Sequence, residues 1–242
     1  MKILKEEDIE IFELSGIAPN PKIESVREGV KLCKENDIDM VLAIGGGSVI
    51  DCAKVVAAGA CYDGDPWDLV ITPRWIKKAL PIYSVLTLSA TGSEMDPFAV
   101  ISDMSKNEKW GTASEHMKPK MSILDPEYTY SVSKKQTAAG TADMISHICE
   151  NYFTNVKNAD VQARFAEGLL KNCFKYGPIA LEEPDNYDAR ANLMWTASMA
   201  INGILSDGVE VSWCVHPMEH ELSAFYDITH GEGLAILTPH WM

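Results

Sequence analysis

The segment from residue 40 to residue 60 constrains the fold most, because it joins a short apolar run to a helix through three glycines. Residues 40–44 are all apolar, as in a strand that is buried on both faces of a parallel sheet. Gly45-Gly-Gly-Ser48 follows, and residues 48–60 have helical periodicity. A strand, a glycine turn and a helix in this order predict a layered α/β fold with a largely parallel sheet.

Further patterns divide the chain into two halves. The first half has a helical pattern at residues 23–36 and short apolar patterns typical of strands, at residues 9–13, 82–88, 99–102 and 121–124. After Asp125-Pro126 come long helical patterns, at residues 133–153, 159–176, 187–205 and 211–225. The first of them opens with a Ser-x-x-Gln capping box at Ser133. We therefore predict an α/β domain at residues 1–128 and an all-helical domain at residues 129–242, with a cleft between them.

Composition and charge exclude several classes of partner. With 242 residues and 46% hydrophobic side chains, the chain has ample material for a packed core. Its net charge of −14 opposes binding to nucleic acid or to an anionic membrane, so any anionic ligand must be held by local backbone dipoles. No apolar run is long enough to span a bilayer, and the first eight residues lack the apolar core of a signal peptide.

The cysteines and the chain ends carry further expectations. The six cysteines form no Cys-x-x-Cys pair and stand in apolar runs, as small core residues do in a reducing compartment. We therefore expect a cytoplasmic protein. The chain begins almost directly on the predicted strand at residues 9–13 and stops at Met242 without a polar tail, so we expect it to be truncated at both ends.

Gly45-Gly-Gly-Ser48 has the sequence context of an anion-binding turn. Glycines let the backbone approach a pyrophosphate closely, and the first N–H groups of the following helix supply donors and a positive dipole end. Ser48 is a candidate N-cap, and Asp51 three residues later would complete a capping box. The alternative is a tight turn that needs positive φ. Because the segment lacks the Gly-x-Gly-x-x-Gly fingerprint, an ordinary Rossmann domain is disfavoured.

A second polar loop, residues 87–94, follows the next predicted strand. Strand ends in parallel sheets face the ligand crevice, so the hydroxyl groups of this loop could reach a cofactor's phosphate, ribose or nicotinamide. A Ser/Thr/Gly cluster after a strand is nevertheless most often only a turn. Glu94 and Asp96 could be caps or surface groups.

The second half carries residues with metal-ligand spacing. Asp143 and His147 stand four apart in a helical pattern, so both side chains leave the same helix face. His216 and His220 repeat that spacing, and His230 precedes a glycine. A single histidine is more often a hydrogen-bonded core or surface residue than a ligand. The grouping favours one divalent metal, Zn²⁺ or Fe²⁺, bound by Asp143, His147, His216 and His230.

Taken in order, these motifs resemble those of the iron-containing alcohol dehydrogenase family, in its butanol dehydrogenase and broad-range aldehyde reductase branch. They are Gly45-Gly-Gly-Ser-Val-Ile-Asp51, Ala90-Thr-Gly-Ser-Glu94, Ile123-Leu-Asp-Pro126, the Asp143/His147 pair, and His216-x-x-x-His220 followed by His230-Gly231. The resemblance implies an N-terminal dinucleotide-binding α/β domain, an all-helical C-terminal domain, and the metal in the cleft between them.

The resemblance also assigns roles position by position. It implies that the metal ligands are Asp143, His147, His216 and His230. It implies that cofactor binding involves the glycine turn, the second loop and a lysine that reaches the ribose, with the residues Gly46, Gly47, Ser48, Asp51, Thr87, Thr91, Ser93 and Lys109. His220 matches a non-ligand histidine beside the nicotinamide, where it would relay a proton or orient its neighbours.

The implied reaction is the reversible reduction of a small aliphatic aldehyde such as butanal by NADH or NADPH, with Fe²⁺ or Zn²⁺ binding the carbonyl oxygen. Members of the family have a further segment before residue 9, which separates NADH from NADPH users, and more helices beyond Met242. A homodimer is expected for the longer parent. Polyol oxidation, as by a glycerol dehydrogenase, a metal-dependent hydrolase or lyase, and an inactive nucleotide-binding fragment stay open as alternatives. Nucleotide binding and turnover would distinguish them.

Overall fold

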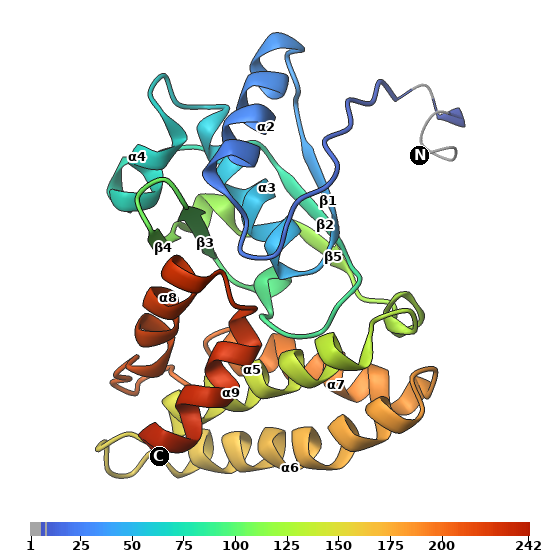
Figure 1. Ribbon diagram of the computed structural model, residues 1–242, viewed down its shortest axis with the longest axis vertical. Helices are drawn as coiled ribbons and strands as arrows, with labels where there is room; N and C mark the ends of the chain where they lie inside the picture. The colour runs from blue at the N-terminus through green and yellow to red at the C-terminus, as the bar shows by residue number, and fades with distance from the viewer. Residues whose placement is uncertain (1–5, 8) are drawn as a thin grey trace.

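The strands of the protein lie in one half of the molecule and the long helices in the other (Figure 1). The computed structural model describes residues 6–7 and 9–242. Within them, β1 (Val41–Gly45), β2 (Ile82–Leu86) and β5 (Met121–Ile123) form a parallel sheet in the order β1-β2-β5. β3 (Phe98–Asp103) and β4 (Glu108–Ala113) form a separate antiparallel pair. The loops that follow β1 and β2 therefore leave the same edge of the parallel sheet.

Between residues 9 and 128, three helices complete the α/β half. They are α2 (Ile23–Glu35), α3 (Gly47–Gly59) and α4 (Pro66–Ile71). Most of α3 is buried because it contacts β1, β2 and β3 as well as α2 and α4. Its apolar residues join those of α2 and β3 in one hydrophobic core, which includes Val26 and Ile101.

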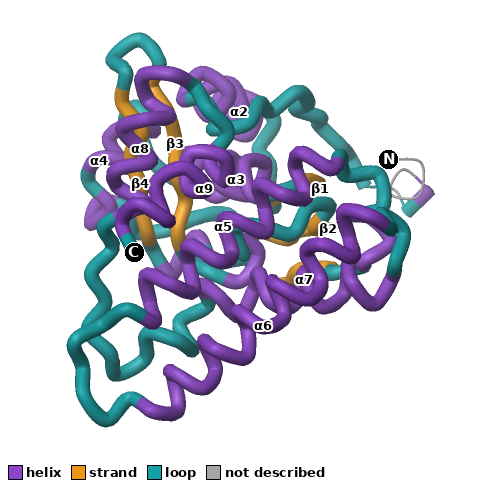
Figure 2. The backbone as a smooth tube through the Cα atoms, turned by 60° about the horizontal axis from the view of Figure 1, so that its bottom comes forward, coloured by secondary structure: helices purple, strands orange, loops and turns teal. Residues whose placement is uncertain are grey.

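The second half is built from five helices in the part of the chain that the structure describes (Figure 2). They are α5 (Lys134–Tyr152), α6 (Asp160–Glu182), α7 (Tyr187–Ile201), α8 (Val215–Tyr226) and α9 (His230–Trp241). α5 contacts α6, α7 and α9, whereas α8 packs against α9 and β4. Short 3-10 turns cover Pro73–Trp75, Ser93–Met95, Glu115–Met117 and Pro126–Thr129.

The predicted fold class, an α/β region followed by an all-helical region, is confirmed. The predicted capping box at Ser133 is confirmed in part, since the Ser133 hydroxyl accepts a hydrogen bond from the backbone N–H of Gln136 at 3.2 Å. The strand predicted at residues 9–13 is wrong, because this segment runs as coil and pairs with none of the described strands. β4, α4 and α9 were not predicted. The sequence of β4, Glu-Lys-Trp-Gly-Thr-Ala, has little apolar character and is recognisable only from its pairing with β3.

One face of the parallel sheet carries exposed apolar side chains. Leu42 and Met121 lie in register with Tyr83, and Ile44 and Ile123 lie in register with Val85. The side chains of Ile44, Met121 and Ile123 are 53%, 58% and 47% exposed. α3 covers the opposite face, where Ala43 and Leu86 are buried.

Two smaller expectations concern the cysteines and membranes. Cys33, Cys52, Cys149 and Cys173 are buried, as predicted, but Cys61 is exposed and Cys214 is partly exposed, so the prediction that all six are core residues is wrong for these two. In the described part of the chain, no helix is both long and apolar enough to cross a membrane.

Candidate metal centre

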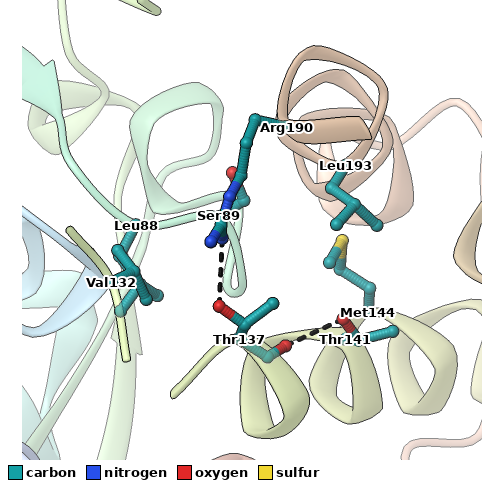
Figure 3. A pocket seen from close by; sticks show the side chains of 8 residues that line it. All are labelled: Leu88, Ser89, Val132, Thr137, Thr141, Met144, Arg190 and Leu193. Carbon is teal, nitrogen blue, oxygen red and sulfur yellow. Dashed lines mark hydrogen bonds between the residues drawn. The ribbon is translucent and has the colours of Figure 1, made fainter. Parts of the chain in front are cut away.

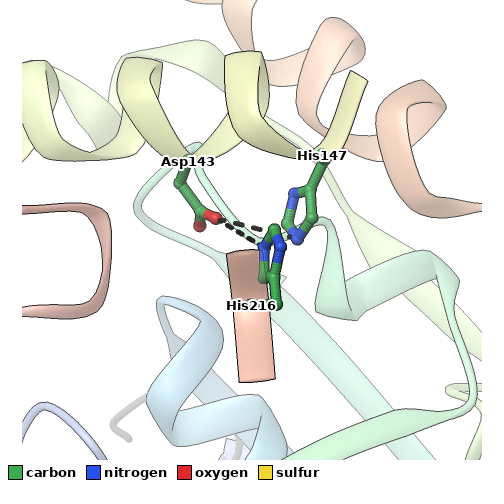
Figure 4. A group of neighbouring side chains, drawn as sticks. All are labelled: Asp143, His147 and His216. Carbon is green, nitrogen blue, oxygen red and sulfur yellow. Dashed lines mark ion pairs between the residues drawn. The ribbon is translucent and has the colours of Figure 1, made fainter. Parts of the chain in front are cut away.

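Four side chains from three helices converge in the helical half. Asp143 and His147 lie one turn apart on α5, His216 stands in the first turn of α8, and His230 begins α9. Figure 4 shows Asp143, His147 and His216 directed at one another. The Oδ1 atom of Asp143 lies 3.7 Å from Nε2 of His147, 3.7 Å from Nε2 of His216 and 3.8 Å from Nε2 of His230. The four predicted ligands are therefore brought together.

This arrangement fits a shared cation better than direct hydrogen bonds. Oδ1 of Asp143 and Nε2 of His216 are buried and have no hydrogen-bond partner among the described residues, which is costly unless another group binds them. Ligand atoms at about 2.0–2.2 Å from a tetrahedral metal lie roughly 3.5 Å from one another. Three imidazole nitrogens and one carboxylate oxygen are a donor set that suits Zn²⁺ or Fe²⁺.

The electrostatics favour the metal-binding forms of two of these groups. Burial opposes ionisation of Asp143, but the surrounding histidines, His147 first, outweigh it and hold the carboxyl pKa below its usual range. Burial lowers the pKa of His147 to about 3, so that this ring is neutral near neutrality. The pKa of His216 is instead raised against the effect of burial by the carboxylates of Asp143 and Glu150. A metal at His216 would therefore compete with a proton for the ring nitrogen.

Glu150 orients His216 and closes the start of α8. Its Oε2 atom accepts a hydrogen bond from His216 Nδ1, which leaves Nε2 directed at Asp143. The same carboxylate accepts hydrogen bonds from the backbone N–H groups of Val215 at 2.7 Å and His216 at 3.1 Å, and from that of Cys214. Because backbone N–H groups at a helix start have no partner within the helix, Glu150 satisfies them while it holds the ring.

Glu219 plays the corresponding part for His230. Its Oε2 atom contacts His230 Nδ1 and lies 3.0 Å from the ammonium nitrogen of Lys109. Lys109 also donates to Asn20 Oδ1 at 3.1 Å and is 8% exposed, so its ammonium group is held inside the protein. Binding of the cofactor ribose by Lys109 stays a prediction.

Neither Glu150 nor Glu219 was predicted. A signal was present, since Glu150 stands three residues after His147 and Glu219 stands three residues after His216, which places each near the ligand face of its helix. Metal-ligating histidines usually donate their second ring N–H to a carboxylate or carbonyl, so acids at such spacing are candidates for that partner.

His220 lies beside the four predicted ligands. Its ring centre is 5.7 Å from that of His230, and its side chain is partly buried. Burial, with the positive charge of Lys109 next in size, holds the pKa of His220 well below its usual range. The ring is therefore neutral near neutrality, which suits a group that accepts a proton or a hydrogen bond. Its role stays a prediction.

The two predicted cofactor loops touch each other at the edge of the parallel sheet. The Thr87 backbone N–H donates to Gly45 O at 3.0 Å, and a Cβ at Gly46 would lie 3.2 Å from Leu88 Cβ. The predicted N-cap role of Ser48 is wrong, because α3 begins at Gly47 and its cap residue is Gly46, which has φ of −85°. The turn consequently needs glycine for close approach and not for positive φ.

Asp51 and Ser93 join a buried polar cluster under these loops. The predicted capping box of Asp51 is wrong, since its carboxylate instead accepts from Ser93 Oγ at 2.5 Å and from the backbone N–H of Val100 at 2.9 Å. Lys54 is fully buried and donates to Ser93 Oγ and Asp96 Oδ1, both at 2.8 Å. Asp96 is therefore a buried ion-pair partner and not a surface group. Glu94 is also buried, and its carboxylate accepts from the Ser198 hydroxyl.

A small cavity of about 10 Å³ separates the second loop from α5 and α7 (Figure 3). Leu88 and Ser89 line it on the loop side, with Thr137 of α5 and Arg190 of α7 opposite. Arg190 donates to Thr137 Oγ1 at 3.0 Å. The cavity has room for roughly one water molecule, so it is too small for a substrate.

Comparisons with known proteins show the family of the chain. The model of the family described as iron-containing alcohol dehydrogenase matches residues 1–126, and that of the C-terminal region of the same family matches residues 137–242. NADH-dependent butanol dehydrogenase A of Clostridium acetobutylicum is 62% identical over 240 residues, which are 99% of this chain and 62% of that protein. NADPH-dependent aldehyde reductase YqhD of Escherichia coli is 44% identical over 96% of this chain and 60% of that protein.

Solved structures give the same assignment. The crystal structure of NADH-dependent butanol dehydrogenase A from Thermotoga maritima superposes with a TM-score of 0.96 at 46% identity, over 99% of this chain and 60% of that one. The chain thus spans about three fifths of the length of these relatives. On the match of both family models, the chain belongs to the iron-containing alcohol dehydrogenase family, as its motifs predicted.

Proposed function

We propose that this chain carries the metal site and part of the cofactor site of an alcohol dehydrogenase that reduces small aliphatic aldehydes reversibly with NADH or NADPH. The convergence of Asp143 with the Nε2 atoms of three histidines, at 3.7–3.8 Å, carries the proposal. Relatives named as butanol dehydrogenases and as an aldehyde reductase support the substrate class. The chain spans 62% of the first of these relatives.

The metal would be held by Asp143, His147, His216 and His230. The family is named for iron, and the donor set suits Fe²⁺ as well as Zn²⁺. When bound, such a cation polarises a carbonyl oxygen and stabilises negative charge that develops on it. Glu150 and Glu219 contact the Nδ1 atoms of His216 and His230, so these two ligand rings are already oriented before binding.

The glycine turn and the second loop would bind the cofactor. The first N–H groups of α3 face the carboxyl edge of the sheet, and Thr91 packs directly on Gly47. A pyrophosphate held there would be bound by backbone donors and by the positive end of α3. Such local attraction is needed because the net charge of −14 repels an anion. Relatives are named for either nucleotide, so both NADH and NADPH are candidate cofactors.

His220 would handle the proton in this scheme. Its neutral ring can accept a hydrogen bond or a proton near the metal ligands, and it lies outside the group formed by Asp143, His147 and His216. An orienting role for the same ring is the alternative. A cytoplasmic location, the two-domain division at residue 128 and a homodimer of the longer parent are further parts of the proposal.

The test is an assay of the purified chain, loaded with Fe²⁺ or Zn²⁺, for oxidation of NADH and NADPH with butanal. Turnover that disappears in His147→Ala, while the fold is kept, would support the proposal. Binding of neither nucleotide, together with metal-dependent hydrolysis of a model ester, would favour the hydrolase alternative and contradict it.

A further inference from the structure

The carboxylate of Glu219 is fixed at both oxygen atoms. Oε2 contacts His230 Nδ1 and lies 3.0 Å from Lys109 Nζ, and Oε1 accepts a hydrogen bond from the Ser223 hydroxyl. Glu219 is fully buried. Since a buried carboxylate is stable only when it is paired and hydrogen-bonded, these three contacts account for its presence in the interior.

Lys109 competes with Glu219 for the same histidine nitrogen. The Lys109 ammonium nitrogen lies 3.3 Å from His230 Nδ1, within hydrogen-bonding distance. An ammonium group can only donate, and a carboxylate can only accept. Nδ1 of His230 therefore either carries a proton and donates to Glu219, or lacks one and accepts from Lys109.

These two hydrogen-bonding arrangements differ in whether the other ring nitrogen of His230, Nε2, carries a proton. A neutral imidazole carries one proton, so acceptance from Lys109 would place that proton on Nε2. Nε2 is the atom that lies 3.8 Å from Asp143 Oδ1, on the side of the other predicted ligands. A protonated Nε2 cannot bind a metal.

We propose that Glu219 is a positioning residue that sets the Nδ1–H tautomer of His230 against the competing Lys109 and so keeps the Nε2 lone pair for a divalent metal. The inference rests on the proposed metal site, but not on the nucleotide or the aldehyde. It distinguishes Glu219 from Glu150, whose other contacts are backbone N–H groups of Cys214, Val215 and His216, and no described lysine contacts the His216 ring nitrogen.

A second metal site formed by Glu219, His220 and His230 is an alternative that the structure supports less well. Donor atoms of Glu219, His220 and His230 lie within 4.8 Å of one another, as in a metal cluster. The Lys109 ammonium already lies 3.0 Å from the Glu219 oxygen, however, and would repel a cation there. Glu219 therefore holds an imidazole and an ammonium group.

The contacts of Lys109 tie the ring of His230 to the α/β half. Lys109 lies on β4 and donates to Asn20 Oδ1, while Asn20 Nδ2 donates to Ile228 O at 2.9 Å in the turn before α9. The ammonium group is thus held close to His230 by residues outside the metal site. Without Glu219 it would remain the nearest donor to Nδ1.

The first experiment reads the tautomer directly in the metal-free chain. Long-range proton–nitrogen NMR spectra of nitrogen-15-labelled histidine distinguish Nδ1–H from Nε2–H rings, and loss of signals in His230→Ala identifies His230. We expect Nδ1–H in the native chain and mainly Nε2–H in Glu219→Gln. Glutamine has only one acceptor oxygen, which Lys109 would also contact, and its NH₂ group can only donate. It therefore holds a proton on Nδ1 of His230 less well than the carboxylate does.

The second experiment measures Co²⁺ affinity by competition with a chelator. Glu219→Gln should bind Co²⁺ roughly 10- to 100-fold more weakly, as expected when the hydrogen-bond partner of a ligating histidine is lost. Glu232→Gln is the matched control, because Glu232 lies on α9 two residues after His230 but pairs with Lys135 at 3.0 Å. The His230 tautomer and the Co²⁺ affinity of Glu232→Gln should equal those of the native chain.

Lys109→Met keeps the test decisive if Glu219→Gln does not fold. It removes the competing donor, while Ser223 and His230 still hydrogen-bond the Glu219 carboxylate, so the Nδ1–H tautomer and the Co²⁺ affinity should persist in the folded variant. A loss of affinity in Lys109→Met, or native tautomer or affinity in folded Glu219→Gln, would overturn the proposal. If the native chain binds no Co²⁺, the proposed metal site fails, whereas the tautomer measurement still decides the role of Glu219.

Discussion

Thr91 fills the space that a side chain at Gly47 would need, since a Cβ built on Gly47 would lie 2.3 Å from Thr91 Oγ1. The contact joins the two loops that were predicted independently to bind the cofactor. It also explains why a glycine follows β1 at this point, although none of the three turn glycines has positive φ. The loops therefore form one packed surface at the edge of the sheet.

Gly47→Ala should weaken NADH and NADPH binding strongly and lower the melting temperature. The added methyl group would push Thr91 away, and Thr91 Oγ1 accepts the Ser93 backbone N–H at 3.2 Å, so the second loop would shift with it. Gly46→Val should have a similar effect on binding, because its Cβ would meet Leu88. Fluorescence titration with each nucleotide measures the loss.

Gly168→Ala is the matched control for this substitution. Gly168 lies inside α6, and a Cβ there meets no atom within 4 Å. Alanine should raise the stability of the helix by about 0.5–1 kcal/mol and leave nucleotide binding unchanged. Unchanged affinity for NADH and NADPH in both Gly47→Ala and Gly46→Val would mean that the glycine turn has only a structural role.

His147→Ala and His230→Ala should each lose most of the bound metal, whereas His220→Ala should keep it. The Nε2 atoms of the first two face Asp143 Oδ1, but His220 lies outside that group. Metal analysis of the three purified variants, after equal loading, gives the comparison. Full metal content in both ligand variants would rule out the assignment.

The sequence was informative where one local pattern carries the structure. The run at residues 40–44 and the glycines after it lie close to their predicted positions, in β1 and at the start of α3. The spacing of Asp143 and His147 directs both to one helix face, as predicted. These features depend on periodicity within a few residues, which a single sequence records.

The rest depends on contacts between distant segments. The roles of Glu219 and Lys109 arise because α8 packs on β4. The two residues are more than a hundred positions apart in the sequence. The capping role predicted for Asp51 fails because Ser93 and Val100 donate to its carboxylate, and that predicted for Ser48 fails because α3 begins one residue earlier, at Gly47. Such competition between local and tertiary partners is invisible in the sequence.

Lys54→Met should destabilise the chain by about 3–5 kcal/mol, because it leaves Asp96 as a buried charge without its partner. Lys54 and Asp96 side chains are 0% and 5% exposed, and they lie 2.8 Å apart. Chemical denaturation measures the change. Lys31→Met removes an exposed pair with Glu35 and should cost at most about 1 kcal/mol, so equal effects would contradict the argument.

Stability should also fall between about pH 4 and pH 6 through Asp51. Burial raises the pKa of Asp51 to about 6, against about 3.9 in an unfolded chain, so the folded state holds this proton more tightly. The resulting stabilisation is present at low pH and is lost as the pH rises through 6. The free energy of unfolding of Asp51→Asn should therefore fall less over this range than that of the native chain, and parallel curves would contradict the assignment.

Ile44→Thr should reduce self-association of the chain at high concentration. Ile44, Met121 and Ile123 form a contiguous apolar face on the parallel sheet and are each about half exposed. Contiguous exposed apolar surface favours association, and threonine keeps the β-branched shape that suits a strand while adding a hydroxyl group. Light scattering after size-exclusion chromatography measures the mass against concentration. Ile71→Thr is the control, since Ile71 is 51% exposed at the end of α4, away from the sheet face, and a native chain that stays monomeric at all concentrations would contradict the prediction.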